Sequence, residues 1–322
     1  MHVKAYLERI HYRGPLAPNA AALRELQVAH LLTVPFENLS IHSGEPIVLE
    51  DKDLYTKIVE RRRGGFCYEC NGLFAALLRA LGFDVTMLSA EVANRDGGFS
   101  QPFDHMALLV NLEQRWLVDV GFGDSFLEPL LLDEKSEQVQ GEHAFRIMPD
   151  GDYLVLSRRA KSEPPASAGG VDQSEPPASA GGVEPPASAG VVSEPPASAG
   201  GVDQSEPSAS AGGVDQSEPP ASAGGVDWQP QYRFTLQPYE FNDFAGMCHY
   251  HQTSPESHFT QGRICSRATA GGGRITLSAG RGNTPSEMRL IITSKNGERQ
   301  ERILESNEEY ADALQKHFGV VM

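Results

Sequence analysis

The sequence is poor in the features that indicate a secreted or membrane protein. Four cysteines in 322 residues are too few for a disulfide framework. No run approaches the roughly 20 apolar residues that a membrane-spanning helix needs, and the most apolar stretch, 72–83, is interrupted by Arg79. The segment Met1–Arg9 lacks an apolar core of signal-peptide length. We therefore expect a cytoplasmic protein with reduced thiols.

Positive charge is missing from one long segment. Residues 162–227 contain six Glu and four Asp but no Lys or Arg, and they hold 11 of the 22 prolines. They account for ten of the sixteen net negative charges, which leaves a net charge of −6 for the other 256 residues. The overall charge of −16 argues against nucleic acid or an anionic membrane as a partner.

The same segment repeats Glu-Pro-Pro-Ala-Ser-Ala-Gly-Gly-Val-Asp-Gln-Ser, with its glutamates 9 to 12 residues apart. A period near twelve is compatible with a solenoid, but valine is the only sizeable apolar residue that neighbouring repeats could bury. Pro-Pro prevents helix and Gly-Gly weakens strands. We interpret 162–227 as a disordered insert, with a partner-binding tail as the alternative. Strand-like stretches at 152–157 and 232–236 flank it, so that the insert replaces a surface loop if they pair.

Outside the insert, helical patterns come first and strand patterns follow. The helical patterns cover 21–32, 53–62 and 67–81, and the strand patterns cover 84–92, 106–110, 116–120 and 153–156. The C-terminal part has strand patterns at 274–278, 288–293 and 301–304, then a helix capped by Ser306 that ends near Gly319. This order predicts an α+β protein rather than alternating βαβ units.

Cys67 is a candidate nucleophile. It lies at the predicted start of a helix, after Gly64-Gly65 and the arginine cluster 61–63. The helix N-terminus and the arginines should both favour the thiolate. A buried structural cysteine is the alternative, and the local sequence does not decide between them.

Cys70 forms a C-x2-C pair with Cys67, which raises redox and zinc alternatives. A redox pair needs a thioredoxin-like βαβ setting, which is absent. Zinc needs two more ligands, and Cys248, His249, His251 and Cys265 lack the usual paired spacing. We expect no metal, and we expect Cys70 to pack inside its helix.

His105 and Asp119 lie at the open end of a predicted hairpin whose strands are 106–110 and 116–120. A turn centred between residues 112 and 113 places them almost opposite each other. The aspartate can then hold one imidazole nitrogen and leave the other free as a base. With Cys67 they form a candidate Cys-His-Asp triad, although a chance surface pair is the alternative. Glu37 is expected to pair with an arginine of 61–63.

These residues together resemble the arylamine N-acetyltransferases. The resemblance lies in Arg63-Gly64-Gly65-Phe66-Cys67-Tyr68-Glu69, in His105 and in Val118-Asp119-Val120-Gly121-Phe122-Gly123, and also in 35–39 and 253–259. It covers most of 1–160 and 232–322 in the family's order.

The resemblance implies a three-domain, cysteine-protease-like fold with helical, β-barrel and α/β lid domains. The predicted boundaries are 1–82 for the helical domain, 83–161 with 228–240 for the barrel, and 241–322 for the lid. It implies acetyl-CoA as the donor and an arylamine or arylhydrazine as the acceptor in a two-step (ping-pong) reaction. By position, Cys67 would be the nucleophile, His105 the base and Asp119 the residue that orients it.

We make two further predictions about the site, one for the acceptor pocket and one for the oxyanion. Phe36, Phe103 and Phe122 should line the acceptor pocket and stack on an aryl ring. The backbone N–H of Tyr68 should stabilise the oxyanion. A Cys-His-Asp amide hydrolase, transglutaminase-like enzymes included, is the main alternative function, and an inactive scaffold is a second.

Overall fold

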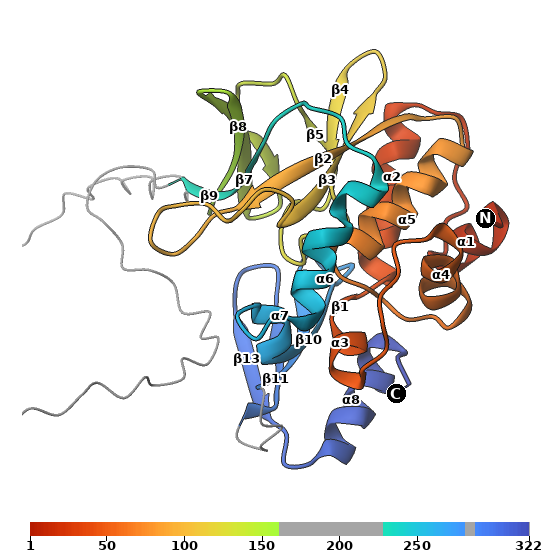
Figure 1. The fold of residues 1–322 in the computed structure, drawn as a ribbon, viewed down its shortest axis with the longest axis vertical. Helices are drawn as coiled ribbons and strands as arrows, with labels where there is room; N and C mark the ends of the chain where they lie inside the picture. The colour runs from red at the N-terminus through yellow and green to blue at the C-terminus, as the bar shows by residue number, and fades with distance from the viewer. Residues whose placement is uncertain (161–227, 281–286, 322) are drawn as a thin grey trace, which may run out of the picture. The chain divides into compact units, whose positions relative to one another are not determined.

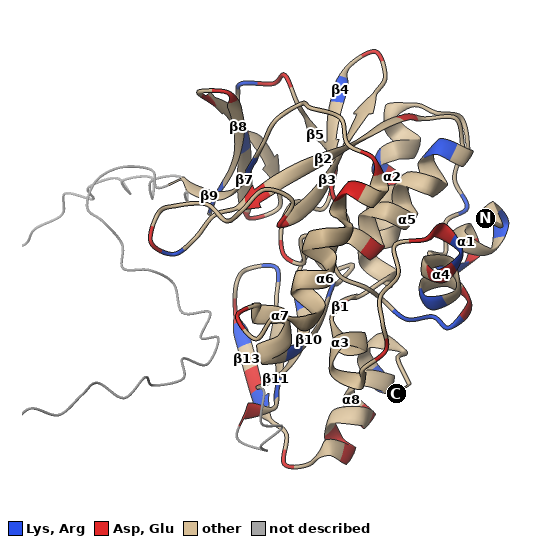
Figure 2. Cartoon of the chain, viewed as in Figure 1, with Lys and Arg blue, Asp and Glu red and all other residues tan. Residues whose placement is uncertain are grey.

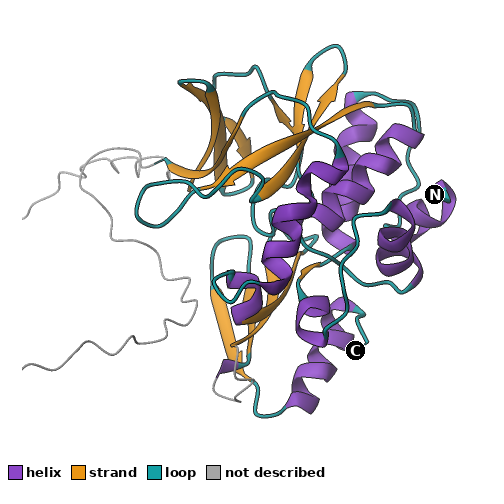
Figure 3. Ribbon diagram, viewed as in Figure 1, coloured by secondary structure: helices purple, strands orange, loops and turns teal. Residues whose placement is uncertain are grey.

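The structure, a computed structural model, describes residues 1–160, 228–280 and 287–321. These residues belong to one compact unit, whose elements are labelled in Figure 1. The predicted disordered insert at 162–227 lies outside the described residues. Figure 3 shows that helices dominate the N-terminal part and that the strands form two separate sheets. This segregation of helices from strands is that of an α+β protein.

The N-terminal part is helical, as the sequence predicts. Its elements are α1 (Val3–Arg9), α2 (Ala20–Thr33), α3 (Leu39–Ser43), α4 (Asp51–Tyr55), the π-helical turn η1 (Thr56–Glu60) and α5 (Cys67–Ala80). The side chain of Asn19 caps α2 by accepting a hydrogen bond from the N–H of Ala22, 3.0 Å away. The single helix predicted at 53–62 is instead two elements, because the helix starts earlier and then widens into η1.

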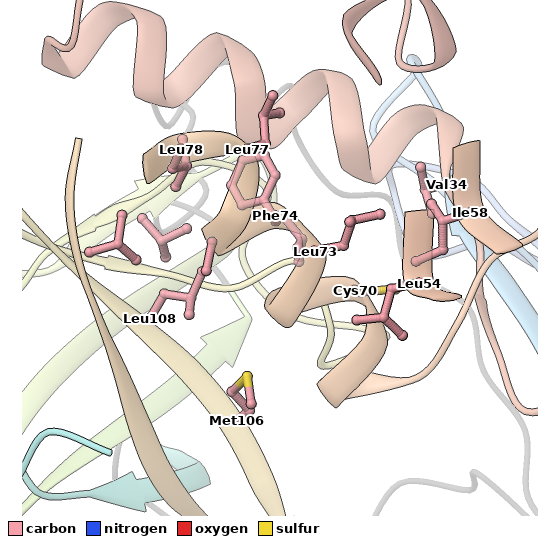
Figure 4. Close-up of a cluster of buried hydrophobic side chains, with 14 of the residues drawn as sticks. Val34, Leu54, Ile58, Cys70, Leu73, Phe74, Leu77, Leu78, Met106 and Leu108 are labelled. Atoms are coloured by element: carbon pink, nitrogen blue, oxygen red, sulfur yellow. The ribbon is translucent and has the colours of Figure 1, made fainter. Parts of the chain in front are cut away.

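Helix α5 is held by apolar side chains that recur at helical spacing. Leu73, Phe74, Leu77 and Leu78 are fully buried, and Figure 4 shows them in the cluster that also contains Met106. This packing fixes α5, and with it Cys67, against the strand that carries His105.

Eight antiparallel strands form the larger sheet in the order β5-β4-β3-β2-β9-β8-β7-β6. The strands are β2 (Asp84–Val92), β3 (His105–Asn111), β4 (Arg115–Val118), β5 (Leu130–Leu131), β6 (Gln138–Gln140), β7 (His143–Asp150), β8 (Tyr153–Ala160) and β9 (Gln229–Phe234). The side chain of Gln138 on β6 bonds both the N–H and the carbonyl of Leu131 on β5, at 2.7 and 2.9 Å. This amide joins the two edges of the sheet, which makes the sheet a nearly closed barrel.

The strands on either side of the insert pair, as predicted. Leu154 of β8 lies opposite Phe234 of β9, and Leu156 lies opposite Tyr232. A long insertion between two paired strands costs only the slowly growing entropy of closing a longer loop. The insert therefore connects two strands that are paired with each other.

Strand β3 is buried on both faces, and its alternation sets the position of the catalytic candidates. Met106 and Leu108 face the helical cluster, whereas Ala107 and Leu109 face the barrel interior. Because side chains alternate along a strand, His105 falls on the barrel side of β3. There its ring lies 5.1 Å from that of Tyr232.

The C-terminal part combines short helices with a second antiparallel sheet. Its elements are η2 (Phe241–Phe244), α6 (Ala245–Thr253), α7 (His258–Gln261), β10 (Gly262–Ala268), β11 (Arg274–Gly280), β12 (Arg289–Thr293), β13 (Arg299–Ile303) and α8 (Asn307–Phe318). As predicted, Ser306 caps α8 and Gly319 ends it in the left-handed conformation. Figure 2 shows charged residues of both signs on the exposed edge strand β13, which discourage edge-to-edge pairing.

One strand pairing joins two of the predicted domains. The short strand β1 (Phe36–Glu37) pairs with β10, with Phe36 opposite Ser266. The division at 82/83 and 240/241 therefore stays a proposal about segments of a single compact unit.

Candidate active site

Cys67 is the first residue of α5. In the loop before it, Gly64 and Gly65 stand at positions that have no room for a side chain. A Cβ on Gly64 would lie 1.9 Å from the carbonyl oxygen of Pro35, and a Cβ on Gly65 would lie 2.6 Å from Cβ of Glu69. The N–H of Glu37 donates to the carbonyl of Gly65 at 2.9 Å, which ties this loop to the 35–37 segment. The two glycines thus fix where the helix starts, and Cys67 is 3% exposed.

His105 and Asp119 are hydrogen-bonded, with 2.7 Å between Nε2 and Oδ2, and both residues are buried. The predicted contact is present, but the strand register differs by one residue. Leu108 lies opposite Val118, and β4 ends at Val118, one residue before Asp119. The bond to Nε2 leaves Nδ1 as the imidazole nitrogen that can accept a proton.

Asn71 is a site residue that the sequence interpretation missed. Its Nδ2 donates to Oδ1 of Asp119 at 2.9 Å and to the carbonyl of Met106 at 2.6 Å, while its Oδ1 accepts from the N–H of Val120. Asn71 lies four residues after Cys67, one helical turn along α5, and this spacing could have drawn attention to it. It connects the helix that begins at Cys67 to the segment that carries Asp119.

Several donors converge on the carboxylate of Asp119. Burial alone raises its pKa, but the charge and hydrogen bond of His105, together with bonds from Asn71 and the N–H of Gly121, lower the pKa below its usual range. Asp119 is therefore ionised at neutral pH and can hold the imidazole in one tautomer.

Close backbone packing brings the cysteine to this pair. A Cβ on Gly121 would lie 2.7 Å from Cα of Cys67, so that only glycine fits there. The backbone of Met106, next to His105, partly offsets the effect of burial by lowering the pKa of the Cys67 thiol. Cys67, His105 and Asp119 thus lie in one buried cluster formed by α5, β3 and the segment after β4.

The expectation that upstream arginines stabilise a thiolate is wrong. Arg61 is paired with Glu45, and Arg63 is paired with Glu37 at 2.9 Å. The second pair confirms the predicted partner of Glu37, but both pairs neutralise the arginine charge. Burial raises the pKa of the Cys67 thiol well above its usual range, and the carboxylate of Asp104 raises it further.

The three phenylalanines predicted for the acceptor pocket lie in different surroundings. The ring of Phe122 packs edge-on against His105, 5.2 Å between centroids. A Cβ on Gly123 would lie 3.5 Å from the ring of Phe36. Phe103 packs instead against Tyr239 and Phe244, at 4.8 and 5.3 Å.

Tyr68 is the second residue of α5, so no earlier helical turn supplies an acceptor for its backbone N–H. Its hydroxyl donates to the carbonyl of Phe103 at 2.7 Å. The N–H follows the nucleophile directly in the chain, at the positive end of the helix dipole.

All four cysteines are free thiols and all are buried. As predicted, Cys70 packs inside α5 and is fully buried. Its sulfur donates to the carbonyl of Gly65 at 3.1 Å. Within the described ranges, no group of three or more His, Cys, Asp or Glu is arranged to hold a metal ion. In the same ranges, no helix combines the length and the apolar character that crossing a membrane requires.

Comparisons with known proteins agree with this geometry. A family model described as N-acetyltransferase matches residues 19–322. The chain is 29% identical to the pineal gland arylamine N-acetyltransferase isozyme NAT-10 of Gallus gallus, over 92% of this chain and 90% of that protein. It is 39% identical to the arylamine N-acetyltransferase of Escherichia coli strain K12, over 47% of this chain and 54% of that protein.

Solved structures give the same result. The arylamine N-acetyltransferase of Mycobacterium marinum in complex with CoA aligns with a TM-score of 0.70 and 26% identity, over 99% of this chain and 92% of that chain. The chain therefore belongs to the arylamine N-acetyltransferase family.

Proposed function

We propose that this protein transfers an acetyl group from acetyl-CoA to an arylamine or arylhydrazine through an acetyl-cysteine at Cys67. The observation that carries the proposal is the buried cluster in which Cys67 packs against the segment of Asp119, and Asp119 holds His105 by a 2.7 Å bond. A cysteine that is 3% exposed suits a small thioester and a flat amine better than a polypeptide. This burial favours the transferase over the amide hydrolase.

In the first half-reaction the sulfur of Cys67 attacks the thioester carbonyl. Nδ1 of His105 takes the thiol proton, so that the sulfur attacks as a thiolate. The bond between the acetyl carbon and the CoA sulfur then breaks, and the imidazolium returns the proton to the departing CoA thiolate. One thioester replaces another, so this step is close to balanced in free energy.

In the second half-reaction the neutral amine attacks the acetyl-cysteine. Aromatic amines stay unprotonated at neutral pH, which leaves their lone pair available. His105 takes a proton from the nitrogen as the C–N bond forms, and this proton returns to the sulfur of Cys67 as the C–S bond breaks. In both tetrahedral intermediates the N–H of Tyr68 would face the oxyanion, aided by the helix dipole.

The first prediction is a covalent acetyl-enzyme. Incubation with acetyl-CoA and no acceptor should add one acetyl group per chain, measured as an intact mass shift and assigned to Cys67 by peptide mapping. The Cys67→Ser variant is the control and should gain no acetyl group. Absence of the adduct in a folded protein that cleaves amide or peptide substrates would replace the transferase with the hydrolase.

The second prediction concerns the acceptor pocket, in which we place Phe36, Phe103 and Phe122. Phe122 is the sharpest test, because its ring touches His105. The Phe122→Ala variant should lose an aryl contact of about 0.5–1.5 kcal/mol, which corresponds to an acceptor KM about two- to tenfold higher. Initial rates with a neutral aniline measure this, and the KM for acetyl-CoA is the internal control. An unchanged acceptor KM would remove Phe122 from the pocket.

We also propose that the protein works in the cytoplasm. The four buried, unpaired cysteines support this location, because a reducing compartment keeps such thiols free.

A further inference from the structure

Two side chains outside the triad hold the turn that leads into His105. In this turn Phe103 has a φ of 68°, in the left-handed region that a residue with a bulky side chain rarely adopts. Its N–H donates to Oγ of Ser89 at 2.7 Å, and its carbonyl accepts from the hydroxyl of Tyr68 at 2.7 Å. A strained conformation of this kind persists only where its surroundings fix it. Ser89 on β2 and Tyr68 on α5 supply that constraint from two different elements.

The hydroxyl of Tyr68 also reaches the peptide group of His105. It lies 3.2 Å from the carbonyl oxygen of Asp104, and this carbonyl belongs to the peptide bond that joins Asp104 to His105. The single hydroxyl hydrogen is shared between this carbonyl and that of Phe103. The pairing of β3 with β2 ends at His105, opposite Ala90, so bonds from side chains replace ladder bonds just before it.

Helix α5 bonds the backbone around His105 at two points. Asn71 lies three residues after Tyr68, on the same face of the helix. It donates to the carbonyl of Met106 at 2.6 Å. The two side chains thus bond the carbonyls of the residues directly before and directly after His105. Because Cys67 begins the same helix, these bonds fix the nucleophile and the base relative to each other.

The phenol of Tyr68 acts as a hydrogen-bond donor. The side chain is fully buried, and its ring packs edge-on against Phe66, 5.0 Å between centroids. Burial raises the pKa of Tyr68 well above its usual range, and the nearby acidic groups of Cys67 and Asp104 raise it further. The hydroxyl therefore keeps its proton at neutral pH, and backbone carbonyls can only accept it.

We propose that Tyr68 and Ser89 are positioning residues that hold the turn before His105 so that its imidazole stays within reach of the nucleophile. The inference rests on the proposed roles of Cys67 as the nucleophile and His105 as the base. Neither hydroxyl takes or gives a proton in the reaction. A small displacement of the base costs a large factor in rate, because proton transfer needs the two heavy atoms within hydrogen-bond reach.

The Tyr68→Phe variant removes the hydroxyl and keeps the ring and the backbone N–H. The rate constant for acetylation of Cys67 in a single turnover should fall about tenfold, while the acetyl-CoA concentration that gives half the maximal rate stays within about twofold. Tyr6→Phe is the matched control, because Tyr6 is also fully buried and its hydroxyl lies 2.9 Å from Nδ1 of His30. It should lower the thermal midpoint and leave the acetylation rate unchanged. A Tyr68→Phe protein that likewise loses only thermal stability would overturn the proposal.

Ser89→Ala tests the same turn from β2. It removes the acceptor for the N–H of Phe103, and the acetylation rate constant should fall about three- to tenfold. Because Ser89 and Tyr68 hold one turn, the Ser89→Ala/Tyr68→Phe double variant should lose less rate than the product of the two single losses. Losses that multiply would show two independent effects and would contradict the shared role.

Alkylation of Cys67 by iodoacetamide separates this inference from the proposed function, because it needs no acetyl-CoA. The imidazole of His105 favours the thiolate, so a displaced imidazole should move the alkylation profile of Tyr68→Phe to higher pH, with the modified cysteine identified by peptide mass. If the unsubstituted protein forms no acetyl-enzyme and the profile still moves, the proposed function fails and the positioning role stands. If the acetyl-enzyme forms and Tyr68→Phe changes neither the acetylation rate nor the profile, the positioning role alone fails.

Discussion

Replacing Asp119 by asparagine is expected to lower kcat by about 10⁴-fold while leaving the fold intact. The carboxylate accepts from Nε2 of His105 at 2.7 Å, and this bond places the imidazole proton on Nε2. An amide in its place can present an NH2 group to Nε2, which favours the proton on Nδ1. The nitrogen that must take the proton of Cys67 is then already occupied, and no charge remains to stabilise the imidazolium.

Two rates are measured. The release of CoA reports the formation of the acetyl-enzyme in a single turnover, and steady-state assays report the transfer of the acetyl group to an aniline. Asn71 and the N–H of Gly121 also bond Asp119, so thermal unfolding should be recorded to separate lost catalysis from lost stability. Asp133→Asn, at an exposed carboxylate paired with Arg115, controls for a general change in charge. A loss of less than tenfold in a folded Asp119→Asn protein would contradict the triad.

The fold could be predicted well wherever the pattern of apolar residues is regular. The strand predicted at 84–92 has the bounds of β2, and the pairing of β8 with β9 follows from two β-branched and aromatic stretches on either side of the insert. Turn geometry was harder to predict. Asn111 pairs with Arg115, and the N–H of Leu112 bonds the carbonyl of Gln114, so the turn is centred on Glu113. This small difference shifted the predicted register by one residue.

The site shows a sharper limit of sequence reasoning. Cys67, His105 and Asp119 could be proposed because a helix start and a hairpin are local features. Asn71 acts through a contact with Asp119, 48 positions away, and no spacing in the sequence reports such a contact. The arginine cluster misled in part for the same reason. Its pairing with Glu37 was predicted, but the pair between Arg61 and Glu45 was not.

The nucleophile's helix depends on a buried ion pair, and breaking it should cost about 3–5 kcal/mol of stability. Nζ of Lys57 is 2.7 Å from Oε1 of Glu69, and the two side chains are 9% and 1% exposed. Burial alone lowers the pKa of Lys57, but the carboxylates of Glu69 and Glu37 raise it overall, so the ammonium stays charged. In Glu69→Gln that charge loses its nearest buried partner.

Urea denaturation at neutral pH measures the cost, and two further variants assign it. Lys57→Met/Glu69→Gln removes both charges and should recover most of the lost stability, because the loss comes from an unpaired charge. Glu8→Gln breaks the exposed pair with Lys4, 4.0 Å apart, and should change nothing measurable. If Glu69→Gln is as stable as Glu8→Gln, the pair does not hold the helix.

Glu69→Ala should cost about 1 kcal/mol more than Glu69→Gln, because Oε2 of Glu69 also accepts from the N–H of Phe66 at 3.1 Å and caps the helix that begins at Cys67.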